Sequence, residues 1–154
     1  MLETTLYQTL SSMELMVSLT TKVHCTSLDS GHLDGNEITT LAEKAFCELK
    51  HLNELNLNSN SLTEETSSIP TDLFSCNPVL SMLDLGNNLM QYLPESITNS
   101  NSLLAISVLT LNYNKLTVIE SNSFSNHSML TDLHLENNLI VTIEDNAFQN
   151  PSQS

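Results

Sequence analysis

Aliphatic residues recur along the chain in the spacing Leu-x-x-Leu-x-Leu-x-x-Asn-x-Leu, which marks an internal repeat. The copies are Leu28, Gly31, Leu33, Asn36 and Ile38 (a looser match); Leu52, Leu55, Leu57, Asn60 and Leu62; Leu80, Leu83, Leu85, Asn88 and Met90; Ile106, Leu109, Leu111, Asn114 and Leu116; and Leu130, Leu133, Leu135, Asn138 and Ile140. The copies begin near residues 28, 52, 80, 106 and 130, so successive starts are 24, 28, 26 and 24 residues apart. A period of this length predicts one solenoid coil per repeat.

The Leu-x-Leu alternation in each copy predicts a short strand with one buried face. Each strand can pair only with its equivalent in the neighbouring coil, which gives a parallel sheet. The intervening segments contain Ile69-Pro70 and Leu93-Pro94 and show no helical periodicity. We therefore expect an α/β-type solenoid, a horseshoe with a parallel β-sheet on its concave face and loops or 3₁₀ turns on its convex face.

The asparagine of each copy ends the strand where the chain turns inward. Its side-chain amide can donate to and accept from backbone groups that a buried bend would leave unpaired. We expect these residues to stack as a buried, hydrogen-bonded ladder that makes no ligand contacts. Its members are Asn36, Asn60, Asn88, Asn114 and Asn138.

A second apolar series lies in the back half of each repeat. The same place holds Ile97 in one repeat and a phenylalanine in the other four: Phe46, Phe74, Phe124 and Phe148. An aromatic series at this spacing is core far more often than it is a cofactor site, so we expect a hydrophobic spine along the convex side.

The repeat divides the chain into an array over residues 28–154 and a preceding segment, residues 1–27. That segment holds an imperfect copy with Leu10, Met13 and Leu15, and Ser18 at the asparagine position, which fits a degenerate repeat or an N-terminal cap. No polar capping motif follows Phe148. Because solenoids need capped ends, we expect this chain to be a fragment of a longer array.

The charge of the chain is strongly acidic, with 18 Asp and Glu against four Lys and no Arg, and a net charge of −14. Such a surface repels phosphates, so we expect no direct nucleic-acid binding and no membrane contact by this segment. It favours a protein ligand with some basic character, although the charge could equally serve solubility alone. No apolar run is long enough to span a membrane, and the first 19 residues make a poor secretory signal.

Little in the sequence points to a metal site or to catalysis. Cys25, Cys47 and Cys76 are widely spaced, and we expect buried free thiols, with a bridge between Cys47 and Cys76 as the alternative. His32 and His134 occupy equivalent positions four coils apart, about 19 Å at the usual strand spacing, which is too far to share a metal. The other histidines are scattered, and we expect all five to be surface or structural residues. No nucleophile elbow or paired-carboxylate motif stands apart from the repeat, so we predict no enzymatic activity and no cofactor.

The consensus, followed by an aliphatic residue and then Ala-Phe, resembles the "typical" leucine-rich repeat class. The clearest stretches are Ile38–Leu41 with Ala45-Phe46, Leu116–Ile119 with Phe124, and Ile140–Ile143 with Ala147-Phe148. That class includes Toll-like receptor ectodomains, Slit-like proteins and small leucine-rich proteoglycans, and the uneven repeat lengths are most similar to a fragment of a Toll-like receptor ectodomain. The resemblance implies an extracellular or cell-surface location, a role in innate immunity and ligand binding on the concave face.

The candidate ligand-binding residues lie between the buried leucines, where the strands expose them on that face, or just after a strand. They are His32, Glu54, Asn56, Met82, Asp84, Val108, Thr110, Tyr113, Asp132 and His134. Tyr113, Met82 and Val108 are the natural apolar anchors among acidic and neutral neighbours. The sequence also carries one glycosylation acceptor, Asn126-His127-Ser128, in a predicted convex loop. Two alternatives remain: an intracellular leucine-rich scaffold that docks regulatory proteins, and a truncated fragment without independent function.

Overall fold

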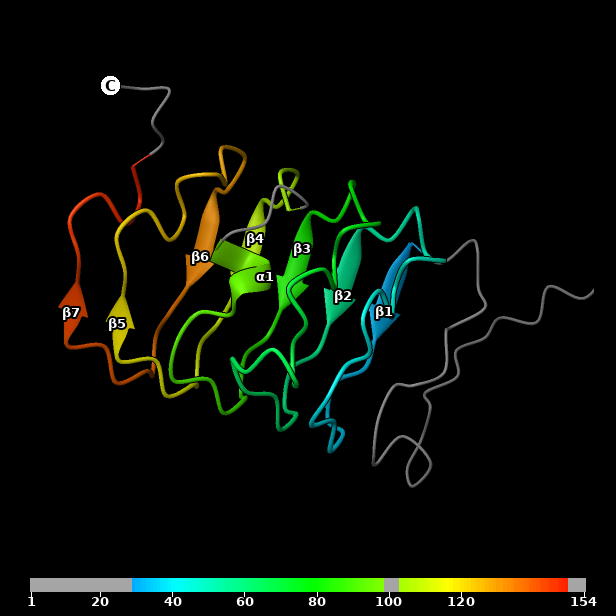
Figure 1. Ribbon diagram of the computed structural model, residues 1–154, viewed down its shortest axis with the longest axis horizontal. Helices are drawn as coiled ribbons and strands as arrows, with labels where there is room; N and C mark the ends of the chain where they lie inside the picture. The colour runs from blue at the N-terminus through cyan, green and yellow to red at the C-terminus, as the bar shows by residue number, and fades with distance from the viewer. Residues whose placement is uncertain (1–28, 99–102, 150–154) are drawn as a thin grey trace, which may run out of the picture.

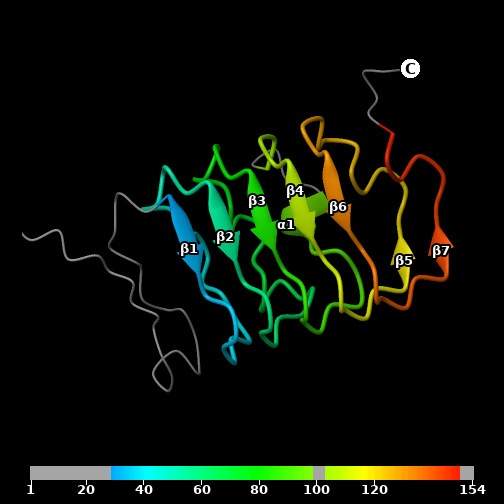
Figure 2. The same cartoon turned by 180° about the vertical axis from the view of Figure 1, so that it is seen from behind.

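The computed structural model of the 154-residue chain describes residues 29–98 and 103–149. Five strands, one per repeat, form a parallel sheet in the order β1-β2-β3-β4-β6 (Figures 1 and 2). They are β1 (Ser30–His32), β2 (Glu54–Asn56), β3 (Met82–Asp84), β4 (Val108–Thr110) and β6 (Asp132–His134). The predicted parallel-strand solenoid is confirmed. The imperfect copy within residues 1–27 lies outside the described residues.

The register of the sheet aligns the central residue of every strand. Leu55 pairs with Leu83 and Leu83 with Leu109, and these side chains are almost completely buried. Gly31 and Leu133 continue the same row at its two ends. Because full burial of a leucine side chain contributes about 2 kcal/mol, each interior coil gains several kcal/mol from stacking on its neighbours. The residues on either side of this row must then point away from the core.

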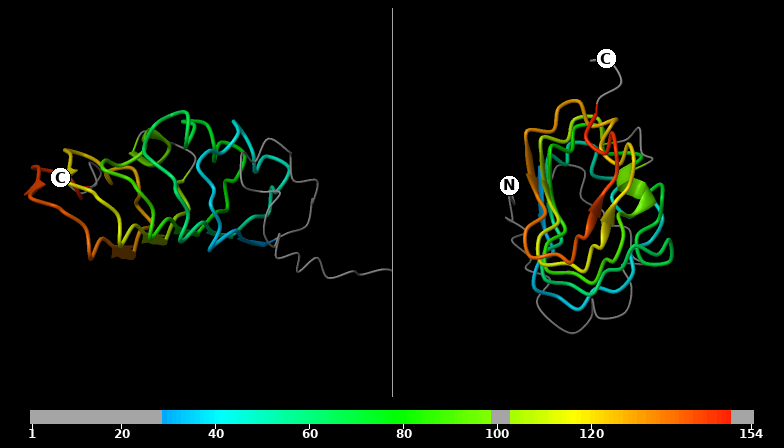
Figure 3. Two further views of the ribbon diagram at one scale, coloured as in Figure 1. Left: turned by 90° about the horizontal axis from the view of Figure 1, so that it is seen from below. Right: turned by 90° about the vertical axis from the view of Figure 1, so that its left-hand side faces the viewer.

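A second, two-stranded sheet was not predicted. β5 (Val118–Ile119) pairs in parallel with β7 (Thr142–Ile143), and end-on views place these strands on the side of the coil opposite the main sheet (Figure 3). Elsewhere the back halves are turns, with one short helix, α1 (Glu95–Thr98). The expectation of loops or 3₁₀ turns is therefore correct, because the back turns carry i→i−3 bonds such as Cys47 N–H to the carbonyl of Lys44, and α1 is the one addition among the described residues.

The asparagine ladder is buried only in its interior. Asn60, Asn88 and Asn114 are 4–7% exposed, and each donates its amide to carbonyls of its own coil and of the preceding coil. Each also accepts the backbone N–H of the preceding coil, as in the bond from Leu62 to Asn88. Asn36 and Asn138 are half-buried, so the expectation of full burial was wrong for them. They belong to the first and last described coils, and a described coil packs against each of them on one side only.

The phenylalanine spine shows the same end effect. Phe46, Phe74, Ile97 and Phe124 are buried, but Phe148 is 51% exposed, contrary to expectation. Its ring stacks on Phe124 with centroids 5.5 Å apart. One face of Phe148 is therefore covered, and no described coil covers the other.

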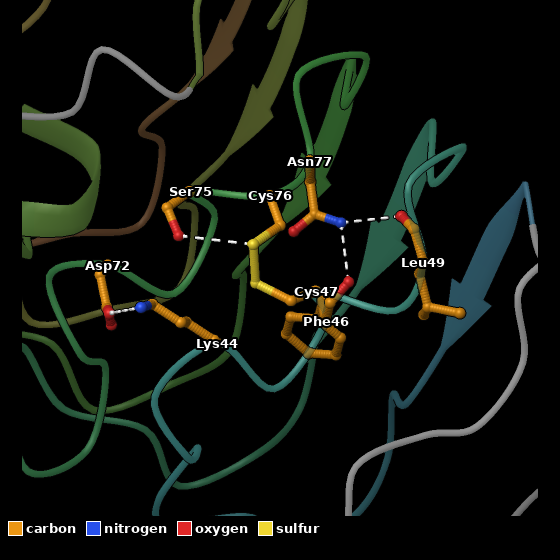
Figure 4. Close-up of a disulfide and its surroundings, with 8 residues drawn as sticks. All are labelled: Lys44, Phe46, Cys47, Leu49, Asp72, Ser75, Cys76 and Asn77. Atoms are coloured by element: carbon orange, nitrogen blue, oxygen red, sulfur yellow. Dashed lines mark hydrogen bonds and ion pairs between the residues drawn. A yellow bond between two sulfur atoms is a disulfide. The ribbon is translucent and has the colours of Figure 1, made fainter.

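Cys47 and Cys76 form a disulfide, so the expectation of free thiols was wrong and the alternative is correct (Figure 4). The bridge joins the back turns of the first two coils, with the two Cα atoms 4.8 Å apart. Beside it, the fully buried Asn77 donates to the carbonyls of Phe46 and Leu49, and Lys44 pairs with Asp72 (Figure 4). These contacts fasten the two coils to each other on the side opposite the sheet. Cys25 lies outside the described residues.

Candidate ligand-binding surface

The concave face is defined here as the outward-pointing side chains of the five-stranded sheet, and it consists of two parallel rows. The strand register places Ser30, Glu54, Met82, Val108 and Asp132 in one row and His32, Asn56, Asp84, Thr110 and His134 in the other. Nine of the ten candidate ligand-binding residues stand in these rows. The tenth, Tyr113, is 53% exposed in the turn after β4.

A shallow hollow of about 110 Å³ lies at the centre of this face. It is lined by residues of β2, β3 and β4. Its polar side chains are Glu54, Asn56, Asp84 and Thr110, and its apolar lining includes the exposed surfaces of Met82 and Val108. Pockets for small organic ligands are usually about 300–1,000 Å³. The hollow is therefore too small for a typical metabolite but suits a single side chain from a protein ligand.

The carboxylates around the hollow differ in how firmly they are held. Asp84 accepts the backbone N–H of Gly86 at 2.8 Å and the amide of Asn58 at 3.2 Å, both on Oδ1. Asp132 accepts the hydroxyl of Thr131 at 2.7 Å. The backbone N–H of Glu54 donates to the carbonyl of Asp29, but its carboxylate has no hydrogen bond or ion pair among the described residues. Asp84 thus shapes the turn after β3, whereas Glu54 keeps its full capacity to accept a cation from a ligand.

A hydrogen-bonded group closes the end of the face nearest β6. Glu136 accepts the amide of Asn112 at 3.1 Å and lies 3.7 Å from Nδ1 of His134. The pKa of Glu136 lies below its ordinary value because its own backbone N–H and the amide of Asn112 favour the carboxylate, with a smaller contribution from His134. Tyr113 stands beside this group, since its backbone N–H donates to the carbonyl of Glu136 at 3.0 Å.

Sequence reasoning missed a glycine that makes room for side-chain amides between the coils. A Cβ at Gly86 would collide with Oδ1 of Asn112 and lie 2.7 Å from Nδ2 of Asn58. The amide of Asn58 also reaches Asp84, and Asn87 donates to Asn58 at 3.3 Å. Gly86 directly follows Leu85, where the neighbouring repeats have Leu57-Asn58 and Leu111-Asn112, and that departure was the available signal.

The ionic character of the face follows from its composition. The lysines among residues 29–98 and 103–149 are Lys44, Lys50 and Lys115, and none stands in either row. Within the same ranges no three His, Cys, Asp or Glu side chains gather closely enough to hold a metal ion. No helix in the described part of the chain is both long and apolar enough to cross a membrane.

The glycosylation acceptor lies on the back of the solenoid, away from the two rows. Asn126 is exposed at the end of the turn that follows β5, whereas His127 is 6% exposed and packs edge-on against Phe124 with centroids 5.9 Å apart. Burial lowers the pKa of His127, and a weak contact with the backbone of Phe124 partly opposes this. Neither ring nitrogen makes a well-formed hydrogen bond to a described residue. His127 therefore has the structural role expected of the histidines.

Comparisons with known proteins agree with this architecture. The family model described as "BspA type Leucine rich repeat region" matches residues 23–154 in six copies. Human keratocan is 35% identical over 118 residues, which cover 77% of this chain and 31% of that protein. Keratocan from Gallus gallus is 32% identical over 120 residues, covering 77% and 32%. The chain thus spans about a third of the length of these relatives.

Two solved structures have similar folds. The leucine-rich repeat domain of APL1B superposes with a TM-score of 0.63 at 24% identity, covering 71% of this chain and 32% of that one. The structure of the Toll–Spatzle complex, from Drosophila, gives a TM-score of 0.50 at 25% identity, covering 81% and 22%. The likeness to APL1B shows the fold of this chain. The likeness to Toll shows a similar fold in a protein whose structure was solved in complex with Spatzle.

Proposed function

The chain belongs to the leucine-rich repeat family, and from this premise we propose that it is a protein-recognition module of an extracellular or cell-surface receptor of the Toll-like, innate-immune kind. Its work is binding and not catalysis. The ligand is a protein with basic character that docks on the two rows of the concave face. Toll, whose structure was solved together with Spatzle as a hub of development and innate immunity, supports the receptor assignment by its fold.

The extracellular placement has support from the covalent chemistry of the chain. The Cys47–Cys76 disulfide joins two successive coils, and disulfides persist chiefly in oxidising compartments. The exposed Asn126 sits in an Asn-X-Ser acceptor sequence, which is modified only in the secretory pathway. Both features favour an extracellular module over an intracellular scaffold.

The observation that carries the ligand assignment is the central hollow. It combines the carboxylate of Glu54, which has no partner in residues 29–98 and 103–149, with the apolar surfaces of Met82 and Val108, and it admits a single side chain. A lysine or arginine side chain meets both requirements, because its aliphatic stem can cover Met82 while its charge approaches Glu54. Rim carboxylates elsewhere on the face would raise the rate of encounter with such a ligand.

Selection of a random peptide library on the immobilised protein tests this proposal. Enriched peptides should carry net positive charge, and Glu54→Lys should weaken their binding about 10-fold or more, the equivalent of roughly 1.4 kcal/mol. Glu43→Lys is the matched control, because it changes the charge equally at an exposed position in a back turn. Enrichment of neutral or acidic peptides would refute the proposal, as would equal losses of peptide affinity in the two variants.

A further inference from the structure

The third and fourth coils separate on the back of the solenoid. The two coils are hydrogen-bonded along the sheet and as far as the bond from Thr117 N–H to the carbonyl of Gln91 at 3.2 Å. Beyond that point β5 pairs with β7 of the next coil. No backbone hydrogen bond joins residues 92–98 of the third coil to residues 118–126 of the fourth. The gap is a hollow of about 430 Å³, within the usual range of ligand sites.

The walls of this hollow combine one aromatic ring with hydrogen-bonding groups. Tyr92, which is 49% exposed, stands on one side with Glu95 and Thr98 of α1. The opposite wall is the turn after β5, with Glu120 and Asn122. No lysine lines the hollow. Uncharged polyhydroxy ligands fit such walls, because hydroxyls donate to carboxylates and accept from amides while the C–H face of a sugar ring covers an aromatic ring.

The turn after β5, which forms one wall of the hollow, also contains the attachment site of a candidate ligand. Asn126 lines the hollow, is exposed, and begins the acceptor sequence Asn126-His127-Ser128. The next residue, His127, is buried against Phe124 and fixes the position of the turn. A sugar on Asn126 is therefore attached at a defined point on the rim of the hollow.

We propose that the hollow between the third and fourth coils seats the first sugars of an N-linked glycan on Asn126, with a sugar ring against Tyr92. In the attachment step, Nδ2 of Asn126 loses a proton and bonds to C1 of the first sugar. The bond from C1 to the diphosphate of a lipid-linked oligosaccharide breaks, and the lipid diphosphate leaves. The seated sugars bridge the two coils across the hollow. This inference shares with the proposed function only the extracellular placement.

The test compares the chain secreted from animal cells with its Ser128→Ala variant, which loses the acceptor sequence but keeps Asn126. Intact mass establishes glycan on the former. Chemical nitration then reads the exposure of two tyrosines, Tyr92 in the hollow and Tyr113 on the concave face. The proposal expects nitration of Tyr92 to be several-fold slower in the glycosylated chain than in Ser128→Ala, and nitration of Tyr113 to be equal in both.

A second measurement uses stability. The glycan should raise the melting temperature by about 3 °C. That gain should survive in a Tyr113→Ala background and disappear in Tyr92→Ala. Absence of glycan on Asn126, equal nitration of Tyr92 with and without glycan, or the same gain in Tyr92→Ala would each overturn the proposal. Affinity for the selected basic peptides is measured on the same samples, so failure of this inference is distinguishable from failure of the proposed function.

Discussion

Replacing Asn88 by alanine should destabilise the protein far more than the same change at Asn36. The Asn88 side chain accepts the N–H of Leu62 and donates to the carbonyls of Leu57, Leu85 and Gly86, at 3.0–3.1 Å. All three carbonyls have a second donor, from Asn60, Asn114 and Ser59 respectively. The N–H of Leu62 has no other partner in the described part of the chain, so it is the group that the substitution leaves buried and unpaired.

The expected loss at Asn88 follows from these bonds. A buried unpaired N–H costs about 1–3 kcal/mol, and the lost donor bonds add roughly 0.5–1.5 kcal/mol each before partial compensation by the second donors. We therefore expect a loss of about 3–5 kcal/mol for Asn88→Ala. The half-buried Asn36 makes two donor bonds within its own coil and accepts none from the described residues, so Asn36→Ala should cost about 1 kcal/mol.

Urea denaturation followed by circular dichroism measures both variants. Asn138→Ala is an informative third, because Asn138 accepts the N–H of Leu116 but is only half-buried, and its loss should fall between the other two. Equal losses at Asn36 and Asn88 would refute the reasoning, because the ladder would then not act through bonds between coils.

Three further predictions test other parts of the structure. Replacing Cys47 and Cys76 together by serine should lower the free energy of unfolding by about 3–4 kcal/mol in denaturant titrations, since the bridge closes a loop across a sequence separation of 29. Peptide mapping of the parent should recover the Cys47–Cys76 link. Gly86→Ala should lower the free energy of unfolding by about 1–3 kcal/mol, because the added Cβ displaces the amides of Asn58 and Asn112. Gly35→Asn should lower it by less than about 1 kcal/mol. Gly35 has φ 65°, a conformation that asparagine tolerates, and nothing lies within 4 Å of an added Cβ. His127→Leu should raise stability by about 1–2 kcal/mol at neutral pH, because it removes two unpaired buried nitrogens where Leu49 occupies the equivalent place in the first coil. Burial lowers the pKa of His127 below its ordinary 6.5, so the unfolded chain takes up the proton first as the pH falls through 6.5. The parent should therefore lose stability in that pH range relative to His127→Leu. If the two proteins show parallel curves of stability against pH, this assignment is wrong.

Most of the fold could be predicted from the repeat, because a given repeat position has the same surroundings in every interior coil. The strands, their register and the burial of Asn60, Asn88 and Asn114 all follow from that regularity. The same reasoning failed for Asn36, Asn138 and Phe148, since burial in a solenoid depends on a coil at each side and a repeat pattern does not encode position in the array.

The repeat pattern also could not predict contacts that occur between only one pair of coils, such as the disulfide and the β5–β7 pair. A buried thiol and a half-cystine occupy similar apolar positions, so only the 4.8 Å approach of the two Cα atoms distinguishes the Cys47–Cys76 bridge from two free cysteines. The β5–β7 pair is two residues long in each strand, too short to show alternation. The candidate rows were predictable as exposed positions, but the hydrogen bonds that hold Asp84 come from Gly86 and Asn58 in the folded turns.

The most direct test of the proposed binding face is a methyl NMR spectrum of the protein recorded with and without a selected basic peptide. Met82 is exposed at the centre of the concave face, and Met129 is exposed outside its two rows. The account predicts that the methyl signals of Met82 and Val108 shift on saturation while that of Met129 stays in place. A shift at Met129 with no change at Met82 and Val108 would contradict it.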